Sequence, residues 1–148
     1  MKRLLMIAVT GAVLASALSA GLASAASSPV KLSLRKTSVG MILVNGRGFT
    51  VYAFTRDAHN HDSCLKIGGC VSVWPPLTTT GKPIAGSGVK ASMLGTISIK
   101  SGATQVTYGG HPLYTYVGDT SPGSTEYVNV SASGGRWPAL SGSGSEVK

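Results

Sequence analysis

The stretch GMILVNGRGFTVYAFTRD, residues 40–57, returns later in the chain as GATQVTYGGHPLYTYVGD, residues 102–119. At a shift of 62 residues, the two copies share glycine, valine, tyrosine and aspartate positions. With one more residue of offset, WPPL (residues 74–77) lies over WPAL (residues 137–140). Two copies of one small unit in a short chain predict two similar halves that share a core.

The chain after residue 26 consists of short β-branched or alternating runs and lacks long stretches of helical periodicity. The turns NGRG (45–48) and GGH (109–111) separate pairs of these runs. We therefore expect an all-β single domain of two pseudo-equivalent β-hairpin repeats, sandwich or barrel-like. The expected strands are 30–35, 41–44, 50–54, 95–99, 104–108, 112–117 and 127–130.

The domain is predicted to span residues 26–140, with repeat one over 40–77 and repeat two over 102–140. Residues 1–25 have the order of a secretory signal peptide: a basic start, an apolar run and an Ala-Ser-Ala cleavage signal at 23–25. We expect export to the periplasm, the extracellular side or the cell wall, with no transmembrane span after cleavage. Residues 141–148 show no apolar anchor and predict a flexible tail.

Basic side chains exceed acidic ones in the exported part of the chain. Without Lys2 and Arg3, 11 basic and 5 acidic residues remain. The basic residues are scattered singly, which favours loose association with acidic envelope polymers. They do not form the clustered patch expected for nucleic-acid binding.

The two cysteines, Cys64 and Cys70, are separated by five residues that include Gly68 and Gly69. In an exported protein, two nearby cysteines predict a disulfide, and the glycines allow the chain to turn tightly between them. A disulfide would remove Cys64 from any set of metal ligands.

The repeated motif places two aromatic side chains on the same face of a strand, because residues two apart in a strand point the same way. The aspartate three residues further on can hold the following turn by accepting backbone N–H groups. The structural interpretation is a core face with a pinned loop; the functional alternative is a binding cleft between the halves. The motif residues are Tyr52, Phe54, Asp57, Tyr114, Tyr116 and Asp119.

Trp74 and Trp137 each precede a proline, which holds the preceding residue extended. We expect each indole to cover the core of its own repeat. The alternative is an exposed aromatic platform for the sugar rings of an envelope glycan.

The loop DAHNHDSC, residues 57–64, suggests a metal site. His59 and His61, with Asp57 and Asp62, are a plausible ligand set for copper or zinc. The second repeat has no histidine in the corresponding loop, so the histidines are not part of the repeated unit. The alternative is a solvated loop closed by the disulfide, with no cofactor.

No coherent catalytic set emerges from the sequence. Paired carboxylates for glycoside hydrolysis would have to come from Asp57 and Asp119, or Glu126. The repetition of Asp57 and Asp119 makes these two equivalent, whereas a catalytic acid and base need unlike environments. We therefore expect no enzymatic activity, with a weak hydrolase as the alternative.

Both copies of the motif fit Tyr-x-[Phe/Trp/Tyr]-x-x-Asp, and together with WPPL and WPAL they resemble the bacterial family of secreted repeats of unknown function. That resemblance implies export and a tandem-repeat architecture. The chain departs from lipoprotein-like members in lacking a cysteine near the cleavage site. The sequence thus predicts a non-catalytic binding or structural module of the cell envelope.

Overall fold

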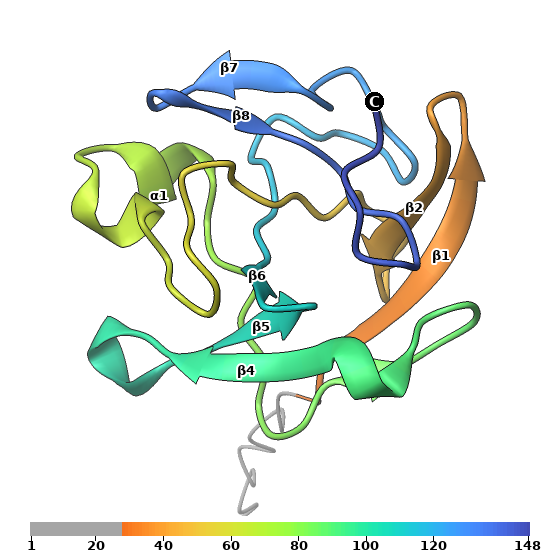
Figure 1. The fold of residues 1–148 in the computed structure, drawn as a ribbon, viewed down its shortest axis with the longest axis horizontal. Helices are drawn as coiled ribbons and strands as arrows, with labels where there is room; N and C mark the ends of the chain where they lie inside the picture. Colours follow the sequence, from red (N-terminus) through yellow and green to blue (C-terminus); the bar gives the residue numbers. More distant parts are fainter. Residues whose placement is uncertain (1–27) are drawn as a thin grey trace, which may run out of the picture.

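The computed structural model describes residues 28–148, so the predicted signal peptide lies outside the described residues. The chain is mostly strand, which confirms the all-β prediction. In Figure 1, the hairpin of β1 (Lys31–Thr37) and β2 (Gly40–Asn45) stands on the right of the molecule. β3 (Ile84–Ala85) pairs in parallel with β1 on its other side.

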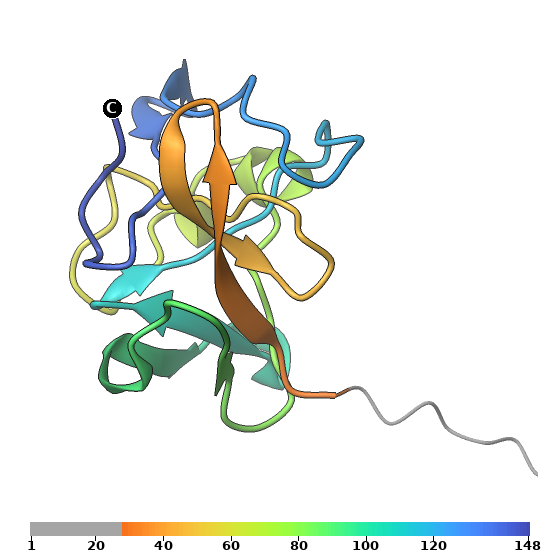
Figure 2. The ribbon, with the colours of Figure 1, turned by 90° about the vertical axis from the view of Figure 1, so that its right-hand side faces the viewer.

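Two further sheets lie below and above this level in Figure 1. β4 (Leu94–Ser98), β5 (Thr104–Tyr108) and β6 (His111–Pro112) form the lower, antiparallel sheet. β7 (Val130–Ala132) and β8 (Gly135–Trp137) form the upper ribbon. The sheets do not close into a barrel, and their arrangement is compatible with a sandwich. Both views show β1 rising from the level of β4 toward that of β7 and β8 (Figures 1 and 2).

Helical structure in the described part is limited to short turns. α1 (Cys70–Val73) lies on the left of Figure 1. Three 3-10 turns cover Cys64–Lys66, Ala91–Met93 and Lys100–Gly102. Glycine and small polar residues interrupt the chain too often for a longer helix.

The predicted strands differ in detail from those observed. Residues 50–54 and 112–117 are extended, but beyond β6 they pair mainly through isolated bridges at Thr50, Tyr52 and Tyr114. Residues 127–130 are mostly a turn, and only Val130 belongs to β7. Each of these segments pairs with several different neighbours over short stretches. None of them therefore forms a continuous β-ladder with a single partner strand.

The WPPL segment of repeat one pairs with repeat two. The Leu77 N–H donates to the Leu113 carbonyl at 2.8 Å, and the Thr115 N–H donates to the Pro75 carbonyl at 3.0 Å. Proline has no backbone N–H to donate to a β-ladder. The WPPL segment therefore pairs with repeat two through its backbone carbonyls and the Leu77 N–H. Repeat two is thus completed by a segment of repeat one.

The WPAL segment makes the reciprocal exchange. The Ala53 N–H donates to the Pro138 carbonyl, and the Leu43 N–H donates to the Leu140 carbonyl, both at 2.9 Å. Repeat one is therefore completed by a segment of repeat two. We call this reciprocal pairing of residues 74–77 and 137–140 the strand exchange.

Tyr52 and Tyr114 meet at the centre of the exchange. Each donates its backbone N–H to the carbonyl of the other at 2.9 Å. Because these are equivalent positions of the two repeats, the halves are related by an approximate twofold axis at this pair.

The core of the described residues divides into a large aliphatic cluster, an aromatic cluster and a small cluster of Ile42, Val44 and Ala139. The aliphatic cluster joins both hairpins through Leu43, Val106, Leu113 and Leu140, among others. The aromatic cluster holds the motif aromatics, both tryptophans and the cysteine pair. The two repeats therefore share one continuous interior, as their duplication predicts.

Within the C-terminal segment 141–148, for which the sequence predicts a flexible tail, one residue contacts the core. Val147 packs against the cluster of Ile42, Val44 and Ala139, and its N–H donates to the Ala139 carbonyl at 2.9 Å. Val147 is the apolar anchor that the sequence prediction overlooked.

Candidate functional site

The repeated motif builds the centre of the core. Tyr52 and Tyr114 are fully buried and Phe54 is 2 % exposed, whereas Tyr116 is half-buried. This is the structural interpretation of the motif, since side chains two apart on an extended segment share the inward face.

Five rings stack in a column through this core. Trp74 and Trp137 are nearly parallel, with ring centroids 4.1 Å apart and an interplanar angle of 3°. Phe54 stacks on Trp137 at 4.1 Å, and Tyr116 lies 4.4 Å from Trp74. Tyr127 continues the series 4.2 Å beyond Tyr116. We call Phe54, Trp137, Trp74, Tyr116 and Tyr127 the aromatic column.

Both tryptophans cover the core, as expected, and the alternative of an exposed aromatic platform does not hold. Trp74 is 1 % exposed and Trp137 is fully buried. Their indoles cover a joint core rather than the core of their own repeats, because the strand exchange brings both Trp-Pro segments to the middle of the molecule.

Each buried motif tyrosine is bonded to the aspartate of the other repeat. The Tyr114 hydroxyl donates to Asp57 Oδ2 at 2.8 Å. The Tyr52 hydroxyl donates to Asp119 Oδ2 at 3.0 Å. We call these the crossed pairs. Sequence reasoning identified all four residues but not the pairing, because the motif alone does not say which copy supplies the partner.

The environment of Asp57 makes its carboxyl easier to protonate than that of an ordinary aspartate, although the carboxyl is still mainly ionised at neutral pH. Burial raises the pKa of its carboxyl to about 6, partly offset by the hydrogen bonds from the Ser63 N–H and Tyr114, and the charge of Asp62 raises it further. Asp57 Oδ1 accepts the Ser63 N–H at 2.7 Å, so this carboxyl pins its loop as the sequence predicts.

The other members of the crossed pairs are shifted in the same direction. Burial likewise raises the pKa of Asp119. The pKa values of Tyr52 and Tyr114 are raised by burial and then by the carboxylate that each contacts. Both phenols therefore remain protonated and act as donors.

The predicted metal ligands are not brought together. His59 and His61 are exposed, whereas Asp57 turns inward to Tyr114. Asp62 is 4 % exposed and accepts the Leu65 N–H at 3.0 Å. Over residues 28–148, no three His, Cys, Asp or Glu side chains come close enough to hold one metal ion.

The disulfide prediction is confirmed. Cys64 and Cys70 are bonded, with Cα atoms 5.4 Å apart, and both are buried in the aromatic cluster. The bond closes the loop that leads into α1 and hence into Trp74.

Two hollows lie at the edge of the core, beside the turn that ends β2. One hollow is lined by Asn45, Arg47, Phe49, Thr50, Thr115, Tyr116, Val117 and Asp119. A neighbouring hollow shares Asn45 and Arg47 and continues to Lys31, Val30 and Leu77. We call the two adjoining hollows the Arg47 groove.

The sequence of the hairpin turn explains the shape of this groove. Asn45 Oδ1 accepts the N–H groups of Arg47 at 3.0 Å and Phe49 at 3.1 Å, and Gly48 has a φ of +83°. The turn presents an exposed Arg47, whose guanidinium lies 5.4 Å from the Phe49 ring centroid. We predicted this turn but not the groove, whose other wall comes from repeat two.

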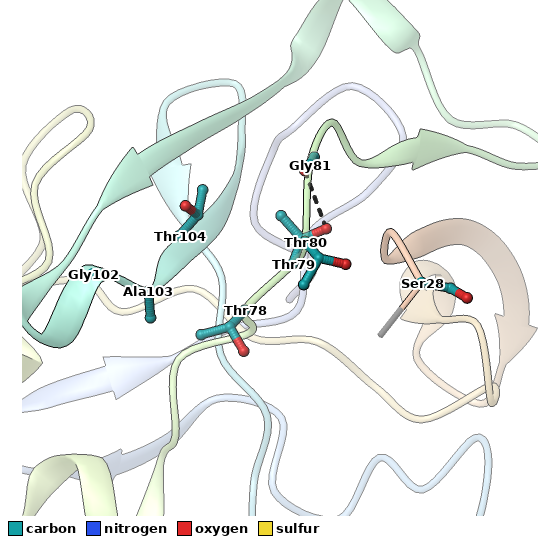
Figure 3. A pocket seen from close by; sticks show the side chains of 8 residues that line it. All are labelled: Ser28, Thr78, Thr79, Thr80, Gly81, Gly102, Ala103 and Thr104. Carbon is teal, nitrogen blue, oxygen red and sulfur yellow. Dashed lines mark hydrogen bonds between the residues drawn. The ribbon is translucent and has the colours of Figure 1, made fainter. Parts of the chain in front are cut away.

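A third hollow, separate from the Arg47 groove, is lined mainly by side chains that carry hydroxyls (Figure 3). Its walls are Ser28, Thr78, Thr79, Thr80, Gly81, Gly102, Ala103 and Thr104. The Thr79 hydroxyl accepts the Val30 N–H and donates to the Gly81 carbonyl, the dashed contact in Figure 3. No charged side chain of the described residues lines this hollow, which makes it the weaker candidate.

Fold and site together define a two-repeat β module whose motif residues form its core. A family model described as "secreted repeat of unknown function" matches residues 33–78 and 95–141, and the chain belongs to this family. Both matched ranges begin before Gly40 and Gly102, so they include most of β1 and β4 in the repeated unit. The family description supports export. Neither the search of curated proteins nor that of solved structures gave a match.

The described residues contain no helix that is both long enough and apolar enough to span a membrane.

Proposed function

We propose that this protein is an exported, non-catalytic module of the cell envelope that binds an acidic or glycan polymer in the Arg47 groove. The observation that carries the proposal is an open hollow at the edge of the motif core, where Phe49 and the exposed Arg47 face a wall that includes Tyr116 and Asp119. The Asp119 carboxylate in this wall is already engaged by the Tyr52 hydroxyl. The protein would act in the periplasm or at the cell wall, without a resident cofactor.

The state of the carboxylates supports a non-catalytic role. Asp57 and Asp119 each accept a hydrogen bond from a buried tyrosine of the other repeat. Both carboxylates thus hold the core together through the same kind of contact, which supports a structural rather than a catalytic role for them.

The groove has the groups that a polymer with carboxylates or phosphates would need. Arg47 offers a planar fork of donors, which suits bidentate contacts to such anions. Phe49 adds an apolar ring, and Lys31 supplies a second cation in the adjoining hollow. Because both hollows are lined by Asn45 and Arg47, a chain-like ligand that passes over these two residues would contact both hollows.

Calorimetric titration of the mature protein with soluble peptidoglycan and teichoic-acid fragments tests this proposal. Arg47→Ser is expected to weaken binding about tenfold, because a hydrogen bond to a charged group contributes about 1.5 kcal/mol. Lys36→Ser is the matched control, since it also removes an exposed cation but lies outside the groove. Equal affinities for both variants, or no binding by the wild type, would contradict the proposal.

A further inference from the structure

The aromatic column contains four rings that are open to one-electron oxidation. They are the indoles of Trp137 and Trp74 and the phenols of Tyr116 and Tyr127, in centroid contact at 4.1–4.4 Å. Indoles and phenols are among the most easily oxidised side chains, and rings in van der Waals contact exchange electrons readily. Tyr116 and Tyr127 are only half-buried, so the column leads from the surface to the core.

An oxidised phenol is a very strong acid, so a tyrosyl radical forms readily only where a base can take the phenolic proton, and an oxidised indole likewise lasts longer where a base can take its proton. The Trp137 indole N–H donates to the Ala132 carbonyl at 3.1 Å, and a peptide carbonyl is a very weak base. Among the described residues, the Trp74 indole nitrogen has no hydrogen-bond partner. Neither tryptophan therefore has a group that could take its proton.

The crossed pairs supply what the tryptophans lack. Tyr114 lies edge-on to Trp137 at 5.1 Å, and Tyr52 lies edge-on to Trp74 at 5.2 Å. Each phenol already donates to a carboxylate, within the distance at which a proton can transfer.

We propose that the aromatic column is a one-electron relay that carries an oxidising equivalent from Tyr127 at the surface to Tyr114 in the core. A one-electron oxidant outside the protein takes one electron from Tyr127 and is reduced. Electrons then move outward along the column through Tyr116, Trp74 and Trp137. In the last step Tyr114 gives one electron to Trp137 and its hydroxyl proton to Asp57. The products are the reduced oxidant, a neutral Tyr114 phenoxyl radical and a protonated Asp57.

Two observations favour Tyr114 over Tyr52 as the final site. Its hydrogen bond is shorter, at 2.8 Å against 3.0 Å. Asp57 also has the raised pKa of about 6, so it binds the transferred proton more tightly than an ordinary carboxylate.

The molecule contains its own control tyrosine. Tyr108 is as buried as Tyr114, but it lies in the aliphatic cluster, and its hydroxyl donates to the Gly142 carbonyl at 2.8 Å. It lacks both contact with the column and a carboxylate acceptor, so no radical is expected there.

Flash oxidation of the full mature chain with photogenerated tris(bipyridine)ruthenium(III) tests the relay, with radicals identified by high-field electron paramagnetic resonance. We expect a tyrosyl signal in the wild type that is lost in Tyr114→Phe and strongly reduced in Asp57→Asn. Tyr127→Phe should slow its appearance, whereas Tyr108→Phe should leave signal and rate unchanged. Circular dichroism of each variant checks that it is folded.

Three outcomes would overturn the proposal. A tyrosyl signal that survives Tyr114→Phe places the radical elsewhere, as does one lost in Tyr52→Phe alone. A signal confined to surface tyrosines, unaffected by Asp57→Asn, shows that no electron is drawn from the core. If Asp57→Asn does not fold, ring-deuterated tyrosine combined with Tyr114→Phe and Tyr108→Phe still assigns the radical.

Discussion

Asp57 and Tyr114 belong to different copies of the same motif, yet they form the shorter of the two crossed pairs. A hydrogen bond to a charged acceptor stabilises a fold more than one between neutral groups. Each copy of the motif therefore supplies one half of a contact, and the other copy supplies the second half. This explains why tyrosine and aspartate occur together in both copies.

Double-mutant cycles should show that the pairing is crossed. For Tyr114→Phe with Asp57→Ala, we expect a coupling free energy of about 1.5 kcal/mol in denaturant unfolding. For Tyr114→Phe with Asp119→Ala, the pair from the same repeat, we expect coupling within about 0.5 kcal/mol of zero. Larger coupling in the second cycle than in the first would refute the crossed arrangement.

Stability should rise as the pH falls from neutral toward 5. The folded-state pKa of Asp57 is about 6, above its ordinary value of 3.8, so the folded state binds this proton more tightly than the unfolded chain. The resulting stabilisation is complete below the unfolded pKa and is lost as the pH rises through about 6. With allowance for solvent screening at this half-buried group, we expect an effect of about 1 kcal/mol.

Thermal unfolding at a series of pH values measures this effect. Asp57→Asn should make the melting temperature depend less on pH between pH 5 and 7. A smaller dependence should remain, because the pKa of Asp119 is also raised. A wild-type melting temperature that falls steadily from pH 7 to pH 5 would contradict the burial of a protonatable Asp57.

Among the elements, the disulfide loop fixes the approach to Trp74. The bond between Cys64 and Cys70 closes a small ring directly before α1, and the Trp74 N–H caps that helix by donating to the Cys70 carbonyl at 2.8 Å. The second repeat reaches Trp137 through the β7–β8 ribbon instead. Two different connecting segments thus place the equivalent residues Trp74 and Trp137 in one stack of rings.

Reduction of the disulfide should destabilise the fold by about 2 kcal/mol, the entropy of closing so short a loop in the unfolded chain. Guanidinium unfolding with and without dithiothreitol measures the difference. The variant Cys64→Ala/Cys70→Ala is the control, because it should be insensitive to the reductant. If reduction leaves the wild-type midpoint unchanged, the loop contributes nothing to stability.

The hairpins were predictable from the sequence, whereas their partners were not. Alternating residues and glycine turns are local signals, so the NGRG turn after β2 and the GGH turn between β5 and β6 were found from the sequence. The positions of Trp74 and Trp137 in the fold depend on contacts between distant segments of the chain. No local sequence pattern predicts such contacts. We therefore identified the tryptophans as important but assigned them to a platform or to separate cores.

The same limit applies to the histidine loop and the groove. His59 and His61 stand in a spacing that suits a metal, but the inward turn of Asp57 and Asp62 removes their carboxylate neighbours. The Arg47 groove needs one wall from each repeat, so the NGRG turn alone could not reveal it.

Taken as a whole, the molecule is a single folding unit made of two incomplete repeats. The hairpin of repeat one lacks a neighbour until residues 138–140 pair with Leu43 and Ala53. The hairpin of repeat two likewise depends on residues 75–77. The aromatic column and both crossed pairs also contain residues of both repeats. Neither repeat can therefore bury its own aromatic residues without the other.

Fragment complementation tests this mutual dependence. Residues 28–90 and 91–148 would be produced separately, and their spectra compared by nuclear magnetic resonance alone and after mixing in equal amounts. We predict that each fragment is unfolded alone, and that the mixture recovers the dispersed spectrum of the intact chain. A dispersed spectrum, typical of a folded protein, from residues 28–90 alone would contradict the strand exchange and the shared core that depends on it.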